Sequence, residues 1–234
     1  MRKFTEILAI AVGRKGSIAA VEVSIPAPLS PENLSAVPGD RWLSQMTQNI
    51  FRAGFNRQVI NSKWPAFEEA FAGFDPERCA KMSDDWFDDL LRDTRIVRNG
   101  ARIQSVRRNA VLVLDTIKRH GSFGRFLAGH GPHQFAQLLE HLHRHGDRLG
   151  DKTAQYFLRE AGVDSYVLSD DVIQRLSIEG VADKVPTSTR ARQTIQQAFD
   201  VWQSESGQSL TYISKVLAMS VESPRVSRFH RTPA

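Results

Sequence analysis

The sequence predicts an all-α fold made of two helical lobes with a cleft between them. Apolar residues recur at intervals of three and four through much of the chain, which is the period of an amphipathic helix. Strand patterns are poor, because the one alternating run, Val21–Ile25, is followed at once by Pro26 and Pro28. A chain of 234 residues can bury one sizeable core or two lobes that share a cleft. We expect the first and last helices to join in one lobe.

Caps and helix breakers predict where the helices begin and end. Pro65 stands in the first turn of a helix expected at residues 64–71, where its missing N–H costs little. Ser83 caps the next helix and is followed by acidic residues in the first turn. The later helices are expected at 103–117, ended by Gly121; at 135–144; through 153–158, ended by Gly162; after a cap at Thr187 or Ser188; and at 209–219, beyond Gly207.

Composition limits the class of protein. Cys79 is the only cysteine, so no disulfide and no cysteine-based zinc cluster can form within one chain. The longest apolar run, Ile7–Val12, is far too short to span a bilayer, and no secretory signal is expected. We therefore expect a cytoplasmic protein. The net charge of +5 and a pI near 9.6 are compatible with a polyanionic partner.

Several blocks of sequence together resemble a known family. They are Phe51–Arg57, Phe71–Pro76, Ile96–Ala110, Arg148–Ala154, Leu168–Leu176 and Pro186–Thr189. In this order the chain resembles the helix-hairpin-helix base-excision DNA glycosylases, and most closely the DNA-3-methyladenine glycosylase I (Tag) family, over roughly residues 40–220. The resemblance implies hydrolysis of the N-glycosidic bond of an alkylated purine, 3-methyladenine, in double-stranded DNA.

Three segments are expected within this framework. Residues 1–40 form an N-terminal helix and a proline-rich connector that pack on the glycosylase unit. Residues 41–222 form the two-lobed helix-hairpin-helix DNA glycosylase domain. Residues 223–234 are a basic mobile tail.

The helix-hairpin-helix is expected where two helices flank a glycine turn. The first helix covers residues 135–144, the turn runs from His145 to Gly150, and the second helix begins near Asp151. Gly150, Asp151 and Lys152 would then direct backbone N–H groups toward a DNA phosphate. The family pattern places two glycines around an apolar residue, but Arg148 occupies the first position, so we expect Gly146 to take the sharp bend. The alternative is an ordinary helical hairpin.

The resemblance also implies a carboxylate at the start of the next helix. Asp170 or the adjacent Asp171 matches the position of an aspartate that stabilises positive charge on the deoxyribose or orients water. The alternative is a cap, because acidic residues after Ser169 favour a first turn. Lys152 has the spacing to Asp170 of a lysine that attacks the sugar and then cleaves the strand. We instead expect Lys152 to face solvent near phosphate, with no strand cleavage.

The base pocket departs from the family pattern. Tag proteins carry a glutamate and a tryptophan where this chain has Asn49 and Arg57. Asn49 can hydrogen-bond a base edge, and Arg57 can contact phosphate or stack on a base. Trp42 and Phe55 flank this position and are the aromatic candidates for the pocket, although aromatic residues at helical spacing are more often core. The 3-methyladenine specificity depends most on these residues.

No metal and no cofactor are expected. Tag proteins hold a structural zinc with two cysteines and two histidines, a pattern that this chain lacks. His141, His143 and His145 are spaced so that only His141 and His145 share one side of a helix, and we interpret them as a solvated face.

We expect a monomer whose partner is double-stranded DNA containing alkylated bases, with no membrane partner and with association with the nucleoid during repair. Two alternatives remain open. One is a non-catalytic DNA-binding or lesion-sensing protein that retains the fold. The other is a helical interaction protein with no nucleic-acid partner.

Overall fold

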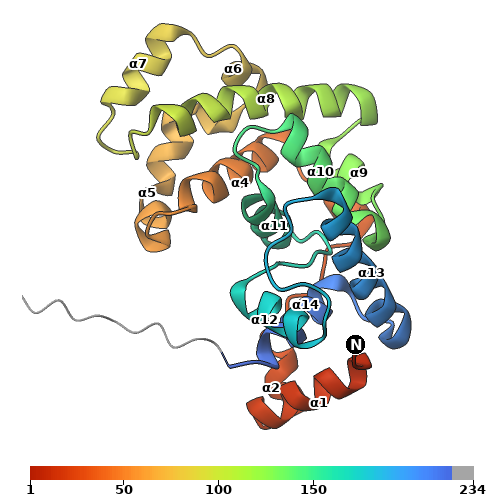
Figure 1. Cartoon of the computed structure of the whole chain (residues 1–234). Coiled ribbons are helices and arrows are strands. Elements are labelled where there is room, and N and C mark those ends of the chain that lie inside the picture. Colours follow the sequence, from red (N-terminus) through yellow and green to blue (C-terminus); the bar gives the residue numbers. More distant parts are fainter. Residues whose placement is uncertain (223–234) are drawn as a thin grey trace, which may run out of the picture. The chain divides into compact units, whose positions relative to one another are not determined.

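A computed structural model describes residues 1–222, and every regular element in that range is helical (Figure 1). The predicted all-α fold is therefore confirmed. The chain divides into two compact units. Residues 26–167 and 209–211 form the larger one, whereas residues 1–25, 168–208 and the described residues from 212 onward form the smaller one. None of the helices in the described range is long and apolar enough to cross a membrane.

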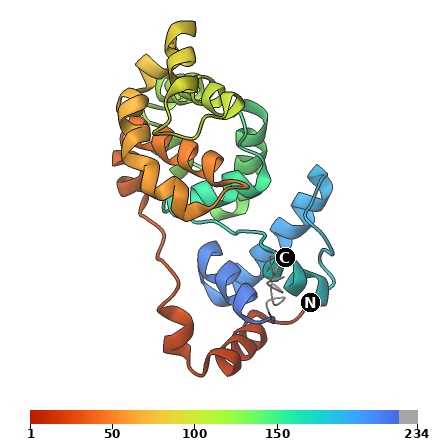
Figure 2. The same cartoon turned by 90° about the vertical axis from the view of Figure 1, so that its left-hand side faces the viewer.

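The division into units runs differently from the segments expected from sequence. Residues 26–40 group with the larger unit, and residues 168–208 group with the N-terminal helices. Both ends of the described chain therefore lie in the smaller unit, as Figure 2 shows by its red and blue ribbons. The expected basic tail, residues 223–234, lies outside the described residues.

The larger unit holds α3 to α11 with two short 3-10 helices. Their bounds are α3 Pro31–Ala36, α4 Gly39–Arg52, α5 Arg57–Ala70, η1 Ala72–Phe74, α6 Pro76–Ala80, α7 Asp84–Arg92, α8 Gly100–His120, α9 Phe123–Ala128, η2 Pro132–Gln134, α10 Phe135–His145 and α11 Asp151–Glu160.

Helix α4 is the centre of this unit because it packs against both α8 and α11. Trp42, Met46 and Ile50 recur at four-residue intervals on its buried face, and each is at most 2% exposed. A run of stacked aromatic rings extends the core toward α5, with Trp64 lying 5.0 Å from Phe67 between ring centroids. At about 1.5–3 kcal/mol for each large apolar side chain fully buried, this core holds α4 in place.

Helix α5 begins at Arg57, whereas the sequence predicted a start near Trp64. The Asn56 side chain caps it by accepting from the Gln58 N–H at 2.9 Å, so Pro65 lies inside the helix. An internal proline costs about 3 kcal/mol. Ile60 and Phe67, which lie on either side of Pro65, are both fully buried and together offset that cost.

The smaller unit joins the two ends of the chain. It contains α1 Phe4–Lys15, α2 Ile18–Glu22, α12 Asp170–Ile178, α13 Thr189–Ser206 and most of α14 Leu210–Met219. The Phe4 backbone N–H donates to Glu205 at 2.8 Å, and the Trp202 indole N–H donates to the Arg2 carbonyl at 3.1 Å. The first and last helices thus belong to one unit, as expected from sequence.

Candidate functional site

The segment expected to form the helix-hairpin-helix joins two helices of the larger unit. Helix α10 ends at His145, α11 begins at Asp151, and the segment between them forms the hairpin. Arg148 has a φ of +61°, in the left-handed region that favours glycine. Leu149, the next residue, is 1% exposed and anchors the hairpin in the core. The chain therefore keeps the glycine-type backbone of the motif at a position where the side chain is arginine.

Gly146 has a different role from the one expected. Its φ of −94° and ψ of 149° are extended, so the sharp bend lies at Arg148. A Cβ at position 146 would lie 2.6 Å from a Leu149 methyl carbon and 2.7 Å from the Leu142 carbonyl oxygen. Glycine is thus required for close packing, since any side chain would push Leu149 out of the core.

Asn109 is a fully buried residue of α8, and its side chain hydrogen-bonds the backbone of the hairpin. Its amide nitrogen donates to the Asp147 carbonyl at 3.0 Å, and its amide oxygen accepts from the Asp147 N–H at 2.8 Å. Arg108 adds an ion pair to the Asp147 carboxylate at 3.0 Å, and the Arg148 guanidinium donates to the Ala101 carbonyl at 3.1 Å. The first half of α8 therefore sets the position of the hairpin.

The N-terminus of α11 offers backbone donors next to this turn. Its cap is Gly150, which has no side chain to accept from the first-turn N–H groups. The Lys152 side chain is exposed in the same turn. Backbone N–H groups, the positive end of a helix dipole and a lysine side chain are groups from which phosphate-binding sites are commonly built.

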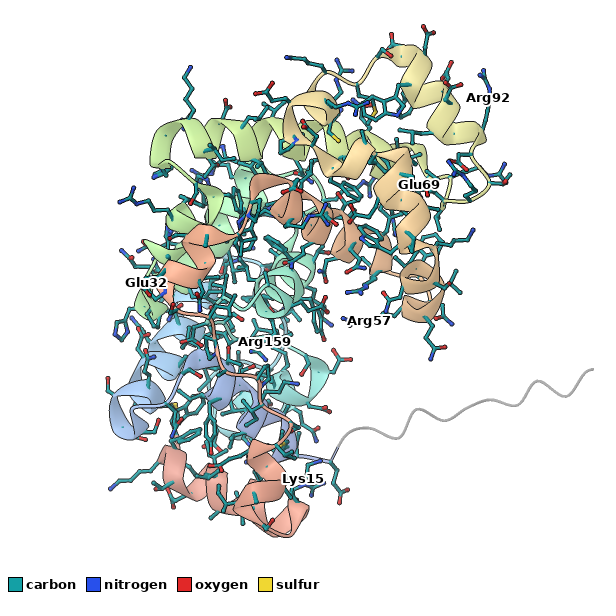
Figure 3. The ribbon with its side chains drawn as sticks, turned by 180° about the vertical axis from the view of Figure 1, so that it is seen from behind. Lys15, Glu32, Arg57, Glu69, Arg92 and Arg159 are labelled. Carbon is teal, nitrogen blue, oxygen red and sulfur yellow. The ribbon has the colours of Figure 1, made fainter. Side chains whose placement is uncertain are left out.

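Asn49 and Arg57, two of the base-pocket candidates, both contact the carboxylate of Glu160, a residue that the sequence analysis did not single out. Asn49 is 6% exposed, and its amide nitrogen donates to the Gln45 carbonyl at 3.1 Å and to the Glu160 carboxylate at 3.3 Å. Arg52 donates to the same carboxylate at 2.6 Å, and Arg57 also pairs with it. Burial, together with the charge of Arg57, lowers the pKa of Arg52. Figure 3 labels Arg57, which lies at the start of α5.

The two aromatic candidates differ in exposure. Trp42 is fully buried, packs between Phe123 and Phe157, and donates its indole N–H to the Val37 carbonyl at 3.1 Å. This placement favours a core role for Trp42. Phe55 is 44% exposed and lies in the turn after α4.

Arg102 fixes that turn to the start of α8. Its guanidinium lies 4.5 Å from the Phe55 ring centroid and donates to the carbonyls of Phe51 and Ala53. Burial and the charge of Arg148 lower the pKa of Arg102. The Phe55 turn and the hairpin are thus both attached to the first turn of α8.

Asp170 and Asp171 lie in the smaller unit, in the first turn of α12. Ser169 is the N-cap and accepts from the Val172 N–H at 3.3 Å, so the capping expected as an alternative does occur. Asp171 also lines a hollow of about 300 Å³ together with Arg14, Lys15 and Lys215. A capping position does not exclude a chemical role, because both carboxylates lie in the first turn of a helix and Asp171 lines a hollow with basic residues.

Among residues 1–222, the histidines and Cys79 are not arranged as a metal site. His141 and His145 lie with ring centroids 4.5 Å apart, as expected from their spacing. Within residues 1–222, no three His, Cys, Asp or Glu side chains are grouped so as to hold a metal ion. Burial raises the pKa of the Cys79 thiol to about 12, so it stays protonated and is a poor ligand.

Comparison with solved structures identifies related folds. A variant of 3-methyladenine DNA glycosylase I (TAG), solved in complex with 3-methyladenine, is 24% identical with a TM-score of 0.50, and the match covers 57% of this chain and 84% of that one. Two structures of the enzyme from Staphylococcus aureus, one of them a point mutant, are each 22% identical with a TM-score of 0.50. Those matches cover 67% and 65% of this chain and 94% and 88% of theirs. At this level of identity the likeness establishes a shared fold.

One segment of the chain also matches a family model. Residues 39–148 match the model of the methyladenine glycosylase family. The matched segment begins with α4 and ends at Arg148, so it includes Asn49, Asn109 and the left-handed residue of the hairpin. The chain is therefore similar to the methyladenine glycosylases over this segment, which is a little under half of its length.

Proposed function

We propose that this protein is a monomeric, monofunctional glycosylase of base-excision repair that removes 3-methyladenine from double-stranded DNA. The observation that carries the proposal is the hairpin between α10 and α11, with left-handed Arg148 and the glycine cap of α11. That geometry suits one DNA phosphate, and the match of residues 39–148 to the methyladenine glycosylase family supports the reaction class.

The proposed chemistry needs one carboxylate. When the N-glycosidic bond breaks, positive charge develops on the deoxyribose, and Asp170 or Asp171 stabilises it or orients the attacking water. Alkylation of the purine places positive charge on the leaving base, which weakens the bond before the enzyme acts. The target nucleotide must leave the base stack to reach these groups.

Lys152 is proposed to bind phosphate and not to attack the sugar. It is exposed in the first turn of α11, whereas amine nucleophiles in enzymes are activated in desolvated pockets. Hydrolysis by water therefore releases the base and leaves the strand intact. Borohydride treatment of lesion-containing DNA should trap no adduct, and an adduct that disappears in Lys152→Ala would contradict this assignment.

Base release from methylated duplex DNA, resolved by base, tests the proposal directly. Wild type should release 3-methyladenine, and Asp170→Asn or Asp171→Asn should nearly abolish release. First-turn acids contribute about 0.3–1 kcal/mol each, so the double variant should remain folded and bind DNA. Asp84→Asn, at the equivalent position of α7, is the matched control and should keep full activity.

Two results would contradict the proposal. Full turnover by the double variant would remove the carboxylate assignment. Tight DNA binding by wild type without release of any base would instead favour a non-catalytic lesion-sensing protein.

A further inference from the structure

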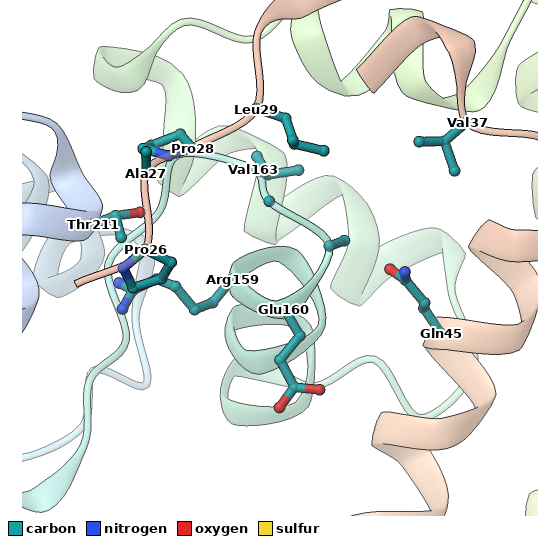
Figure 4. A pocket seen from close by; sticks show the side chains of 12 residues that line it. Pro26, Ala27, Pro28, Leu29, Val37, Gln45, Arg159, Glu160, Val163 and Thr211 are labelled. Atoms are coloured by element: carbon teal, nitrogen blue, oxygen red, sulfur yellow. The ribbon is translucent and has the colours of Figure 1, made fainter. Parts of the chain in front are cut away.

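Two cavities of similar volume differ in the charge of the residues that line them. One, of about 320 Å³, lies in the larger unit, and its charged lining residues are Arg159 and Glu160, one of each sign (Figure 4). The other is the hollow of about 300 Å³ in the smaller unit, where three of the four charged lining residues are cationic. We call the second cavity the cationic hollow. Its excess of positive charge is what an anionic ligand requires.

Three helices of the smaller unit bring the charges of the cationic hollow together. Arg14 and Lys15 lie in the last turn of α1, Lys215 lies in α14, and Asp171 lies in the first turn of α12. Figure 3 labels Lys15 at the end of α1. Among the described residues of this unit, acidic and basic side chains are equal in number. The excess of cations is therefore local to the hollow.

Helix ends explain only part of this cluster. Cations in the last turn of a helix interact favourably with its dipole, which accounts for Arg14 and Lys15. Lys215 lies before the last turn of α14, so the same reason does not apply to it. Arg14 pairs with Glu222 at 3.8 Å, but the Glu222 side chain is 86% exposed, and such a surface pair contributes little. Arg14 can therefore turn to an anion at little cost.

A phosphodiester fits the charge and the size of the hollow. It carries one negative charge, which three cations and one carboxylate can accommodate without leaving a net negative site. Lysine and arginine are the side chains that most often contact DNA phosphates. A volume of about 300 Å³ is at the lower end of cavities that hold small molecules, so it has room for a phosphate and part of the adjoining sugar.

We infer that the cationic hollow binds the DNA phosphate next to the nucleotide whose base is removed, with Lys15 and Lys215 as its main contacts. Asp171, which lines the same hollow, then faces the deoxyribose attached to that phosphate. The inference rests on the proposed function, because that reaction makes DNA the ligand and brings the sugar to Asp170 or Asp171. Helices α1, α12 and α14 all lie outside residues 39–148, so the contact is additional to the segment that matches the family model.

The affinity of the double variant Lys15→Met/Lys215→Met for duplex DNA, measured across salt concentrations, tests the contact. Methionine keeps an unbranched side chain and removes the charge. The double variant should bind about fivefold more weakly than wild type or worse, and the slope of log affinity against log salt should fall by about one, because one phosphate is no longer neutralised.

Lys184→Met is the matched control for this experiment. Lys184 is an exposed lysine of the same unit, and it does not line the cationic hollow. Its variant loses the same charge, so it should bind duplex DNA within about twofold of wild type with an unchanged salt slope. All variants should unfold at the same denaturant concentration as wild type, which excludes a structural cause of any loss.

Single-turnover base release with all DNA bound tests whether the phosphate lies next to the target sugar. The double variant should release base about tenfold more slowly than wild type even at saturating protein, because the sugar is no longer aligned with the carboxylate. Lys184→Met should release base at the wild-type rate. Loss of DNA affinity with normal single-turnover release would overturn the placement beside the target sugar.

Asp171→Asn tests the charge of the hollow in the opposite direction. Its carboxylate repels a phosphate in the same hollow, so Asp171→Asn should bind duplex DNA about twofold more tightly than Asp170→Asn. Asp170 is the matched control because it is in the same helical turn but does not line the hollow. Equal affinity of the two variants would contradict a phosphate beside Asp171.

Inorganic phosphate distinguishes a DNA phosphate from a small phosphate compound. Suppose that phosphate stabilises wild type against denaturant more than chloride does at equal ionic strength, and that the double variant lacks this effect. If the double variant nevertheless binds DNA normally, the hollow takes a small phosphate compound and the inference is overturned. Loss of both effects in the double variant supports the DNA contact.

The remaining outcomes separate this inference from the proposed function. If wild type releases 3-methyladenine and the double variant binds DNA and releases the base equally well, the inference is overturned and the glycosylase function stands. If wild type releases no base but its DNA affinity depends on Lys15 and Lys215, the hollow is a DNA phosphate site and the proposed function fails. Absence of DNA binding by wild type at low salt overturns both.

Discussion

The strongest test of the hairpin is Asn109→Leu, which removes its main attachment to α8. The wild-type amide makes two hydrogen bonds with the backbone of Asp147 and is fully buried. Leucine matches its shape but leaves a backbone N–H and a carbonyl without these partners. Each such buried group costs about 1–3 kcal/mol, so the free energy of unfolding should fall by about 2–6 kcal/mol.

Thr116→Val provides the matched control on the same helix. Thr116 is 5% exposed, but its hydroxyl donates at 2.7 Å to Leu112 within α8 and holds no other element. Its loss should cost less than about 1 kcal/mol. Denaturant unfolding followed by circular dichroism measures both variants.

The functional part of this prediction concerns DNA. If the attachment contributes about 1.4 kcal/mol to holding the hairpin against phosphate, duplex affinity should fall about tenfold in Asn109→Leu under conditions where it is folded. Thr116→Val should bind normally. The reasoning is refuted if Asn109→Leu is as stable as wild type, or if it loses stability and binds DNA unchanged.

Three further results are expected. Duplex affinity should fall steeply with salt, and Lys152→Ala should reduce the slope of log affinity against log salt by about one; binding that is flat with salt would exclude the DNA-based functions. Elemental analysis should find no stoichiometric zinc, and one tightly bound zinc per chain would contradict the expectation that this chain lacks a zinc site. Burial, with the charges of His145, His130 and His120, lowers the pKa of His141 below its ordinary 6.5. The folded state thus binds this proton more weakly than the unfolded state, so stability is full above about pH 6.5 and is lost as pH falls below it. Denaturant unfolding measured above and below pH 6.5 should show that His141→Leu loses less stability at acid pH than wild type does. An equal loss in both proteins would show that other groups cause the acid sensitivity.

Local chemistry explains why several helix ends were predictable. Ser83 and Ser188 cap α7 and α13 with their own side chains, and Gly121 and Gly207 end α8 and α13 at positive φ. These preferences depend on a few neighbouring residues, so they can be inferred from sequence. Pro65 shows where prediction from local sequence fails. Burial of other residues in α5 outweighs the preference of proline for the first turn, so the helix begins before it.

The candidate site was less predictable because it depends on contacts distant in sequence. Glu160 lies 111 residues from Asn49, and nothing in the local sequence of either indicates that they meet. The hairpin shows a second reason why sequence alone was insufficient. A missing glycine suggested that the bend moved to Gly146, whereas the fold keeps the left-handed backbone and places Arg148 in it. For a non-glycine residue this conformation costs about 1–2 kcal/mol, which the attachments of the hairpin to α8 can offset.

The contacts that α8 makes with the hairpin and with the Phe55 turn are relevant to how the enzyme would position a flipped base. Arg102 holds the turn that carries Phe55, while Ala101, Arg108 and Asn109 hold the hairpin, and all four belong to the first half of α8. A base-flipping enzyme must keep its phosphate contact and its base-proximal side chains at a set distance, because small displacements of reacting groups reduce rates strongly. One rigid helix that anchors both segments meets this requirement. Substitutions in the first half of α8 should therefore impair base release more than their effect on DNA affinity alone would explain.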